Sequence, residues 1–132
     1  MQRKDLKILL LQIRDEQKVR DEERLSFARY SNLNPSQIHV HNVFEIPNFE
    51  PNIVDGFNAL YIGGASEANV LMPNKYIFVK DCLKLIRYAS EKNVPTFASC
   101  FGFQLAILAF GGKILSQDTD YEMGSIPITL TN

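Results

Sequence analysis

The feature that most constrains this chain is a short apolar segment that passes directly into a helical pattern, with a cysteine at the junction. The segment follows Pro95 and has the length and composition of a buried strand. Beyond it, Leu105, Leu108 and Ala109 recur at helical spacing. Cys100 therefore lies between a strand and a helix, which indicates an α/β chain.

The residues around Cys100 predict a nucleophile elbow, a sharp turn that lifts a reactive side chain above a sheet. Ala98, Ser99 and Gly102 are small enough for strand and helix to approach closely. The first N–H groups of a helix from about Gly102 would point toward the sulfur and favour a thiolate. The alternative is that Cys100 is only a small buried hydrophobe, but that role would not need small neighbours. We expect an unfavourable backbone conformation at Cys100.

The remaining pattern alternates between strands and helices. We expect a central strand at 7–13, a strand near an edge at 37–43, a buried strand at 59–62, a short strand at 113–115 after a Gly111-Gly112 helix cap, a turn at 116–120 and an edge strand at 126–132. One helix should carry Asp21, Glu22 and Glu23 in its first turn and face the sheet with Leu25, Phe27 and Ala28. Another should start at Tyr76 and point Val79, Leu83, Ile86 and Ala89 inward.

These elements predict an α/β fold. We expect a three-layer, flavodoxin-like or Rossmann-like open parallel sheet with helices on both faces and a short antiparallel extension near the C-terminus. A length of 132 residues fits a single domain, residues 1–132, and 45% hydrophobic residues are enough for a core.

Gly63 and Gly64 follow the strand expected at 59–62, at its carboxyl end. Paired glycines there allow positive φ and leave backbone N–H groups uncovered, at the edge where open α/β sheets bind ligands. The alternative is a tight turn without a binding role. The sequence leaves both open, and it matches no phosphate loop or dinucleotide fingerprint.

Composition excludes several partners. A net charge of −1 gives no electrostatic attraction to nucleic acid or to an anionic membrane surface. The apolar runs are short of a membrane span and the N-terminus has no secretory pattern, so we expect a cytoplasmic protein with free thiols. No Cys and His spacing suggests a metal, and no cofactor is expected. Cys82 lies on the apolar side of its helix and is expected to be structural.

His39 and His41 are the two histidines of the chain. They alternate on one strand and so share a face, which would allow a catalytic or metal-binding pair. No third ligand has recognisable spacing, so we interpret them as half-buried or solvated polar positions.

The residues 98–104 resemble the elbow pattern G-x-C-x-G-x-Q of the class I glutamine amidotransferases of the Cys-His-Glu type, and the chain is similar to the amidotransferase domain of GMP synthase. Residues 55–64 are similar to the family's strand leading into its oxyanion loop, and 122–124 to a glutamate and glycine before an outer strand. Ala98 departs from the first glycine of the pattern, and Phe103 stands where the family often has histidine.

The resemblance implies a mechanism. Cys100 would attack the side-chain amide of glutamine, forming a glutamyl thioester and releasing ammonia to a synthetase domain or subunit. The backbone N–H groups of Phe101 and of Gly63 or Gly64 would hold the oxyanion. Gln104 would contact the glutamine.

The family's base and orienting acid come from a His-x-Glu segment well after the elbow, and no histidine follows Cys100. We therefore expect a C-terminally truncated domain that does not turn over glutamine appreciably and that self-associates or is only marginally stable. An alternative is a hydrolase or glyoxalase-like enzyme of the related cysteine-elbow superfamily of intracellular proteases and chaperones, with Asp15 or Glu16 as the acid beneath the thiol. A further alternative is a non-catalytic binding module. Gln104 favours the amidotransferase.

Overall fold

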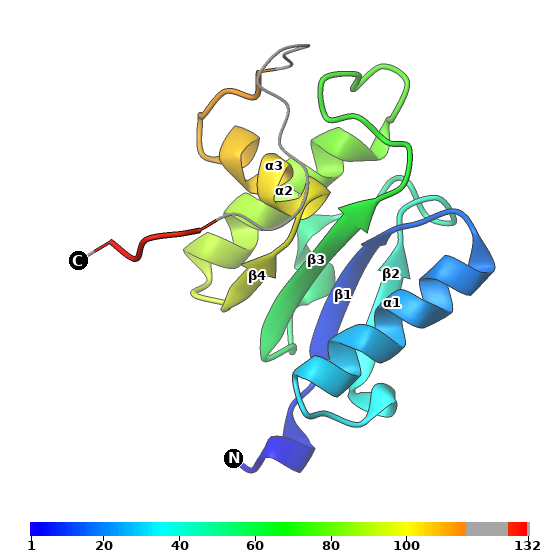
Figure 1. The fold of residues 1–132 in the computed structure, drawn as a ribbon, viewed down its shortest axis with the longest axis vertical. Coiled ribbons are helices and arrows are strands. Elements are labelled where there is room, and N and C mark those ends of the chain that lie inside the picture. The colour runs from blue at the N-terminus through cyan, green and yellow to red at the C-terminus, as the bar shows by residue number, and fades with distance from the viewer. Residues whose placement is uncertain (116–126, 132) are drawn as a thin grey trace.

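The computed structural model describes residues 1–115 and 127–131, and in them the strands form one parallel sheet (Figure 1). The strands are β1 (Ile8–Ile13), β2 (Ile38–Asn42), β3 (Ala59–Ala65) and β4 (Thr96–Ala98), in the spatial order β2-β1-β3-β4. This order begins the flavodoxin-like arrangement. The prediction of an α/β parallel sheet is confirmed, with β1 inside the sheet and β2 at an edge.

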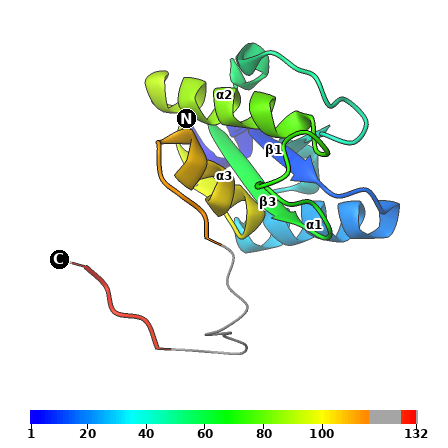
Figure 2. The ribbon, with the colours of Figure 1, turned by 90° about the horizontal axis from the view of Figure 1, so that it is seen from above.

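Helices cover both faces of the sheet, as predicted (Figures 1 and 2). Helix α1 (Gln17–Tyr30) lies on one face, and α2 (Phe78–Glu91) and α3 (Phe101–Ala109) pack on the other. In the described residues, short 3₁₀ turns lie before β1 at Arg3–Asp5 and between later elements at Pro35–Gln37 and Pro51–Val54. All helices in the described part of the chain are too short or too polar to cross a membrane.

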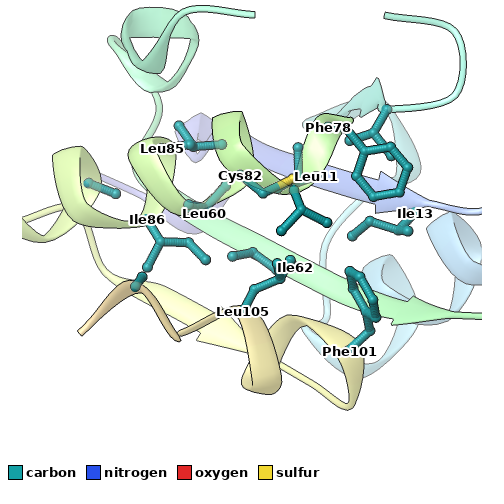
Figure 3. Close-up of a cluster of buried hydrophobic side chains, with 14 of the residues drawn as sticks. Leu11, Ile13, Leu60, Ile62, Phe78, Cys82, Leu85, Ile86, Phe101 and Leu105 are labelled. Carbon is teal, nitrogen blue, oxygen red and sulfur yellow. The ribbon is translucent and has the colours of Figure 1, made fainter. Parts of the chain in front are cut away.

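The larger core lies between the sheet and α2 and α3 (Figure 3). Alternate residues of β1 and β3 form the sheet side of this core, because side chains alternate between the faces of a strand. Its fully buried members include Leu11, Ile13, Leu60, Ile62, Leu85 and Leu105. Cys82 points into the same cluster with none of its surface exposed, which confirms the structural prediction for this cysteine.

Helix α1 differs from the prediction in two ways. It starts at Gln17 after the N-cap residue Glu16, so its first turn contains no acidic residue. Leu25 is 54% exposed and does not face the sheet. The inward face repeats instead through positions 20, 23, 24, 27 and 28. Its first two turns are charged because they meet the polar carboxyl ends of the strands.

Two predicted strands near the C-terminus are wrong where the structure describes them. Neither 113–115 nor 127–131 joins a strand, and the side chains of 127–131 are exposed, so the described residues contain no antiparallel extension. The turn at 116–120, the residues 122–124 and positions 126 and 132 lie outside the described residues. Gly111 has φ +85° after α3, which confirms the predicted helix cap.

Strand β4 was predicted to be buried, and this is wrong. It is the outermost strand of the sheet in the described residues, with Thr96 exposed and Phe97 56% exposed. Phe97 contacts the rings of Phe27 and Tyr61 edge to face, beside an open cleft of about 390 Å³ between α1 and the sheet.

Candidate active site

The turn from β4 into α3 holds Cys100 in a strained conformation. Its φ of 54° and ψ of −113° are unfavourable for a residue with a side chain, at a cost of about 1–3 kcal/mol. The neighbouring backbone fixes the turn, because the N–H of Ser99 donates to the carbonyl of Ile62 at 3.0 Å. Cys100 is exposed at the N-terminus of α3. The predicted strain is confirmed.

Gly102 allows α3 to lie directly on β3. A Cβ at this position would lie 2.7 Å from both the carbonyl oxygen and the Cγ2 atom of Ile62. Any larger residue would push the helix away from the strand, and Cys100 with it. The prediction that a small residue is needed here is confirmed.

Gly63 and Gly64 lie inside β3, at its carboxyl end, and neither has positive φ. The expected left-handed backbone is therefore wrong, and so is the alternative of a tight turn. A Cβ on Gly64 would lie 3.4 Å from the Cβ and 3.7 Å from the Sγ of Cys100. The glycine pair and Cys100 therefore share one edge of the sheet, as the sequence predicted. The glycines leave open space into which side chains from other elements extend.

An ion pair that was not predicted from the sequence lies at this edge of the sheet. Arg14, the residue after β1, donates from Nε to Oε2 of Glu23 at 2.9 Å and from Nη1 to Ser66 Oγ at 3.1 Å. A Cβ on Gly63 would lie 2.6 Å from the Glu23 carboxylate, and one on Gly64 would lie 3.0 Å from Arg14 Nη2. A charged residue directly after a central buried strand was the signal that could have revealed it.

Phe101 and Gln104 follow Cys100 on α3. Phe101 is the first residue of the helix, where a backbone N–H has no partner within the helix. Gln104 is half-buried and lines a pocket of about 320 Å³ together with Ser66, Asn69 and Leu71 from the segment after β3. Phe101 and Gln104 therefore lie at the same edge of the sheet as Cys100.

Cys82 and the two histidines lie apart from this site. Burial, with a smaller contribution from the charge of Asp81, raises the pKa of the Cys82 thiol well above its usual range. His39 and His41 lie on β2, at the sheet edge opposite β4. His41 Nε2 is 3.1 Å from the carbonyl of Ile46, and burial lowers the pKa of this imidazole. Within residues 1–115 and 127–131, no three His, Cys, Asp or Glu side chains gather in a way that could hold a metal.

Comparison with known proteins assigns part of the chain. A family model described as glutamine amidotransferase class-I matches residues 56–132, a segment that contains Gly63, Gly64, Cys100 and Gln104. Arg14 and Glu23 precede it. Neither the search of curated proteins nor the search of solved structures finds a match.

Proposed function

The chain belongs to the class I glutamine amidotransferase family, and on that premise we propose that Cys100 is the nucleophile of a glutaminase reaction. The observation that carries this is the strained backbone of Cys100 at the start of α3, with the glycine pair alongside. The sulfur bonds to the amide carbon of glutamine, and the amide nitrogen leaves as ammonia after taking a proton. Water then releases glutamate from the thioester.

Backbone N–H groups would stabilise the negative oxygen that develops as the C–S bond forms. We assign this role to Phe101 and to Gly63 or Gly64, because both strand and helix meet at Cys100. Donors fixed in position need no reorganisation when charge appears, which makes such sites effective. Gln104 would contact the glutamine from the neighbouring pocket.

The reaction needs a base, which in the Cys-His-Glu type of the family is a histidine. His39 and His41 lie at the far edge of the sheet from β4, so neither is offered as that base. With nucleophile and oxyanion donors alone, a triad enzyme keeps about 10³–10⁴-fold catalysis over water. We therefore expect this chain to bind and acylate more readily than it turns over.

A chloroketone analogue of glutamine tests the proposal without requiring turnover. Cys100 sulfur would bond to the analogue's methylene carbon and expel chloride, and the adduct is located by peptide mass mapping. We expect saturable labelling of Cys100 that glutamine slows, with Cys82→Ser behaving as the parent and Cys100→Ser unlabelled. Equal rates with chloroacetone, which lacks the amino-acid part, would mean that the site does not recognise glutamine.

A second candidate is a hydrolase or glyoxalase-like activity of the related superfamily. One observation favours it: a buried carboxylate, Glu23, lies against Gly63, although Asp15 and Glu16, the acids named from the sequence, are exposed. Consumption of methylglyoxal by the chain, lost in Cys100→Ser, would support this candidate. Its absence together with glutamine-protected labelling would leave the amidotransferase.

The remaining proposals concern partners and location. A synthetase domain or subunit like those of GMP synthase would consume the ammonia, and a cytoplasmic location would keep both thiols reduced. Self-association is supported by the exposed Phe97 beside the open cleft. Sedimentation velocity over a range of concentrations tests this, and a monomer throughout would contradict it.

A further inference from the structure

Arg14 presents an unused hydrogen-bond donor beside Cys100. Its Nε and Nη1 atoms donate to Glu23 and Ser66, while Nη2 has no hydrogen-bond partner in the described part of the chain. The Cβ position that Gly64 leaves empty is 3.0 Å from Nη2 and 3.7 Å from Cys100 Sγ. Nη2 and the sulfur therefore border the same space, which a side chain at 64 would have filled.

The main chain of Arg14 is held in place by buried polar groups. Its carbonyl accepts hydrogen bonds from Arg20 Nε at 2.9 Å and from Asn42 Nδ2 at 2.8 Å. Asn42 also donates to Gln12 Oε1, and Gln12 donates to the carbonyl of Arg20. Gln12 and Asn42 are both almost fully buried. This network connects β1, β2 and α1, and it fixes the point from which the Arg14 side chain starts.

Glu23 fixes the other end of the Arg14 side chain. Only 9% of the Glu23 side chain is exposed, and its Oε1 atom is buried without a hydrogen-bond partner in the described residues. A half-satisfied buried carboxylate is costly, and such groups gather at functional sites. The carboxylate accepts from Nε, and Nη2 then lies 3.0 Å from the vacant Cβ position of Gly64. A guanidinium held in this way is suited to a carboxylate.

We propose that Arg14, oriented by Glu23 and Ser66, forms an anion subsite beside Cys100 that binds the carboxylate of a small molecule reacting there. Arg14 and Glu23 lie outside the segment that the family model matches, and Ser66 lies within it. For glutamine as the reactant, an assignment that rests on the proposed function, the group bound would be its α-carboxylate. Arg14 would then be a specificity-determining residue.

Two alkylating reagents that differ in charge test the subsite directly. In both reactions the Cys100 sulfur bonds to a CH₂ carbon, iodide leaves, and the thiol proton goes to the buffer. Iodoacetate carries a carboxylate, and iodoacetamide is its neutral match. We expect the ratio of the iodoacetate rate to the iodoacetamide rate at Cys100 to be about tenfold higher in the folded chain than in the same chain unfolded in urea. An equal or lower ratio in the folded chain overturns the proposal.

Variants identify the donor. Arg14→Gln should remove the preference, but it leaves the Glu23 carboxylate buried without its partner. The double variant Arg14→Gln/Glu23→Gln avoids this, keeps the net charge and replaces the pair by two amides. It should also lose about tenfold in the rate ratio. Arg29→Gln removes an exposed positive charge elsewhere on α1 and should keep the ratio. A double variant that keeps the ratio of the parent overturns the proposal.

The test separates this subsite from the amidotransferase assignment. Loss of the iodoacetate preference in the double variant supports the subsite even where glutamine fails to protect Cys100. If glutamine protects, the double variant should need about tenfold more of it for the same protection. Unchanged protection would overturn the role of Arg14 in binding glutamine.

Discussion

The two cysteines of this chain occupy opposite kinds of environment. Cys82 lies on α2 within a helix of relaxed conformation, fully buried in the same hydrophobic cluster as Leu11 and Leu60 (Figure 3). Cys100 is exposed, and it has a backbone conformation that side chains avoid. The same residue type therefore packs in the core in one place and is exposed to solvent at a strained turn in the other. The difference in environment comes from the backbone conformation at each cysteine and from the residues packed around it.

The largest expected effect is in thiol reactivity. Iodoacetamide near neutral pH should modify Cys100 about 10³-fold faster than Cys82, because Cys82 reacts only after local opening, which costs ~4 kcal/mol or more. While Cys82 is buried, the raised pKa of its thiol keeps it protonated, so no reaction occurs without that opening. Peptide mapping over time measures both rates, and faster modification of Cys82 would remove the contrast.

Gly102→Ala should make Cys100 react more like an ordinary exposed thiol. The new methyl group meets the Ile62 backbone and side chain at 2.7 Å, so α3 must shift, at a cost of about 1–3 kcal/mol. The shift should also slow alkylation of Cys100. Gly111→Ala is the matched control, because a Cβ there meets no atom within 4 Å and strains only the backbone. It should lower stability by about 1 kcal/mol and leave the Cys100 rate unchanged. Equal Cys100 rates in both variants would contradict this.

The same substitution at both cysteines sharpens the comparison. Cys82→Ser places a hydroxyl among apolar side chains and should lower the free energy of unfolding by about 1–3 kcal/mol. Cys100→Ser should change it by less than about 0.5 kcal/mol, because the side chain is exposed. Urea denaturation followed by circular dichroism measures both. A larger loss at Cys100 would show that its side chain packs against the protein.

Cys100→Gly should stabilise the chain. Glycine adopts φ 54° and ψ −113° without a Cβ clash, so the variant should recover the strain less the extra entropy of glycine, a net of about 1 kcal/mol. Cys100→Ala keeps the Cβ and should show no such gain. If both variants have the same stability, the conformation carries no strain.

The sequence predicted the parallel α/β sheet with a central first strand, and the turn at Cys100, because both depend on local patterns. Continuous apolar residues in β1 and small residues around Cys100 have few structural interpretations. The charged cluster was not predicted because Arg14, Glu23 and Ser66 come from different elements, and only the packing of α1 on the sheet brings them together.

Other errors have the same physical origin. Leu25 has the hydrophobicity of a core residue, but the rotation of α1 follows the hydrogen bonds that Arg20 and Arg24 make to the backbone. Gly63 and Gly64 were expected to offer positive φ and uncovered N–H groups, with a tight turn as the alternative, whereas a carboxylate and a guanidinium lie against the space that side chains there would fill. In each case the partner lies on another element, and no local pattern specifies it.

The buried amide pair of Gln12 and Asn42 has a consequence for folding. All other residues of β1 are apolar and buried, so hydrophobicity alone would tolerate β1 pairing one position out of step with β2. The two amides are direct partners across the strands, and a slipped alignment would bury both without their hydrogen bond. This pair therefore lets the chain discriminate among otherwise similar strand alignments during folding, and it sets the position of the residue that follows β1.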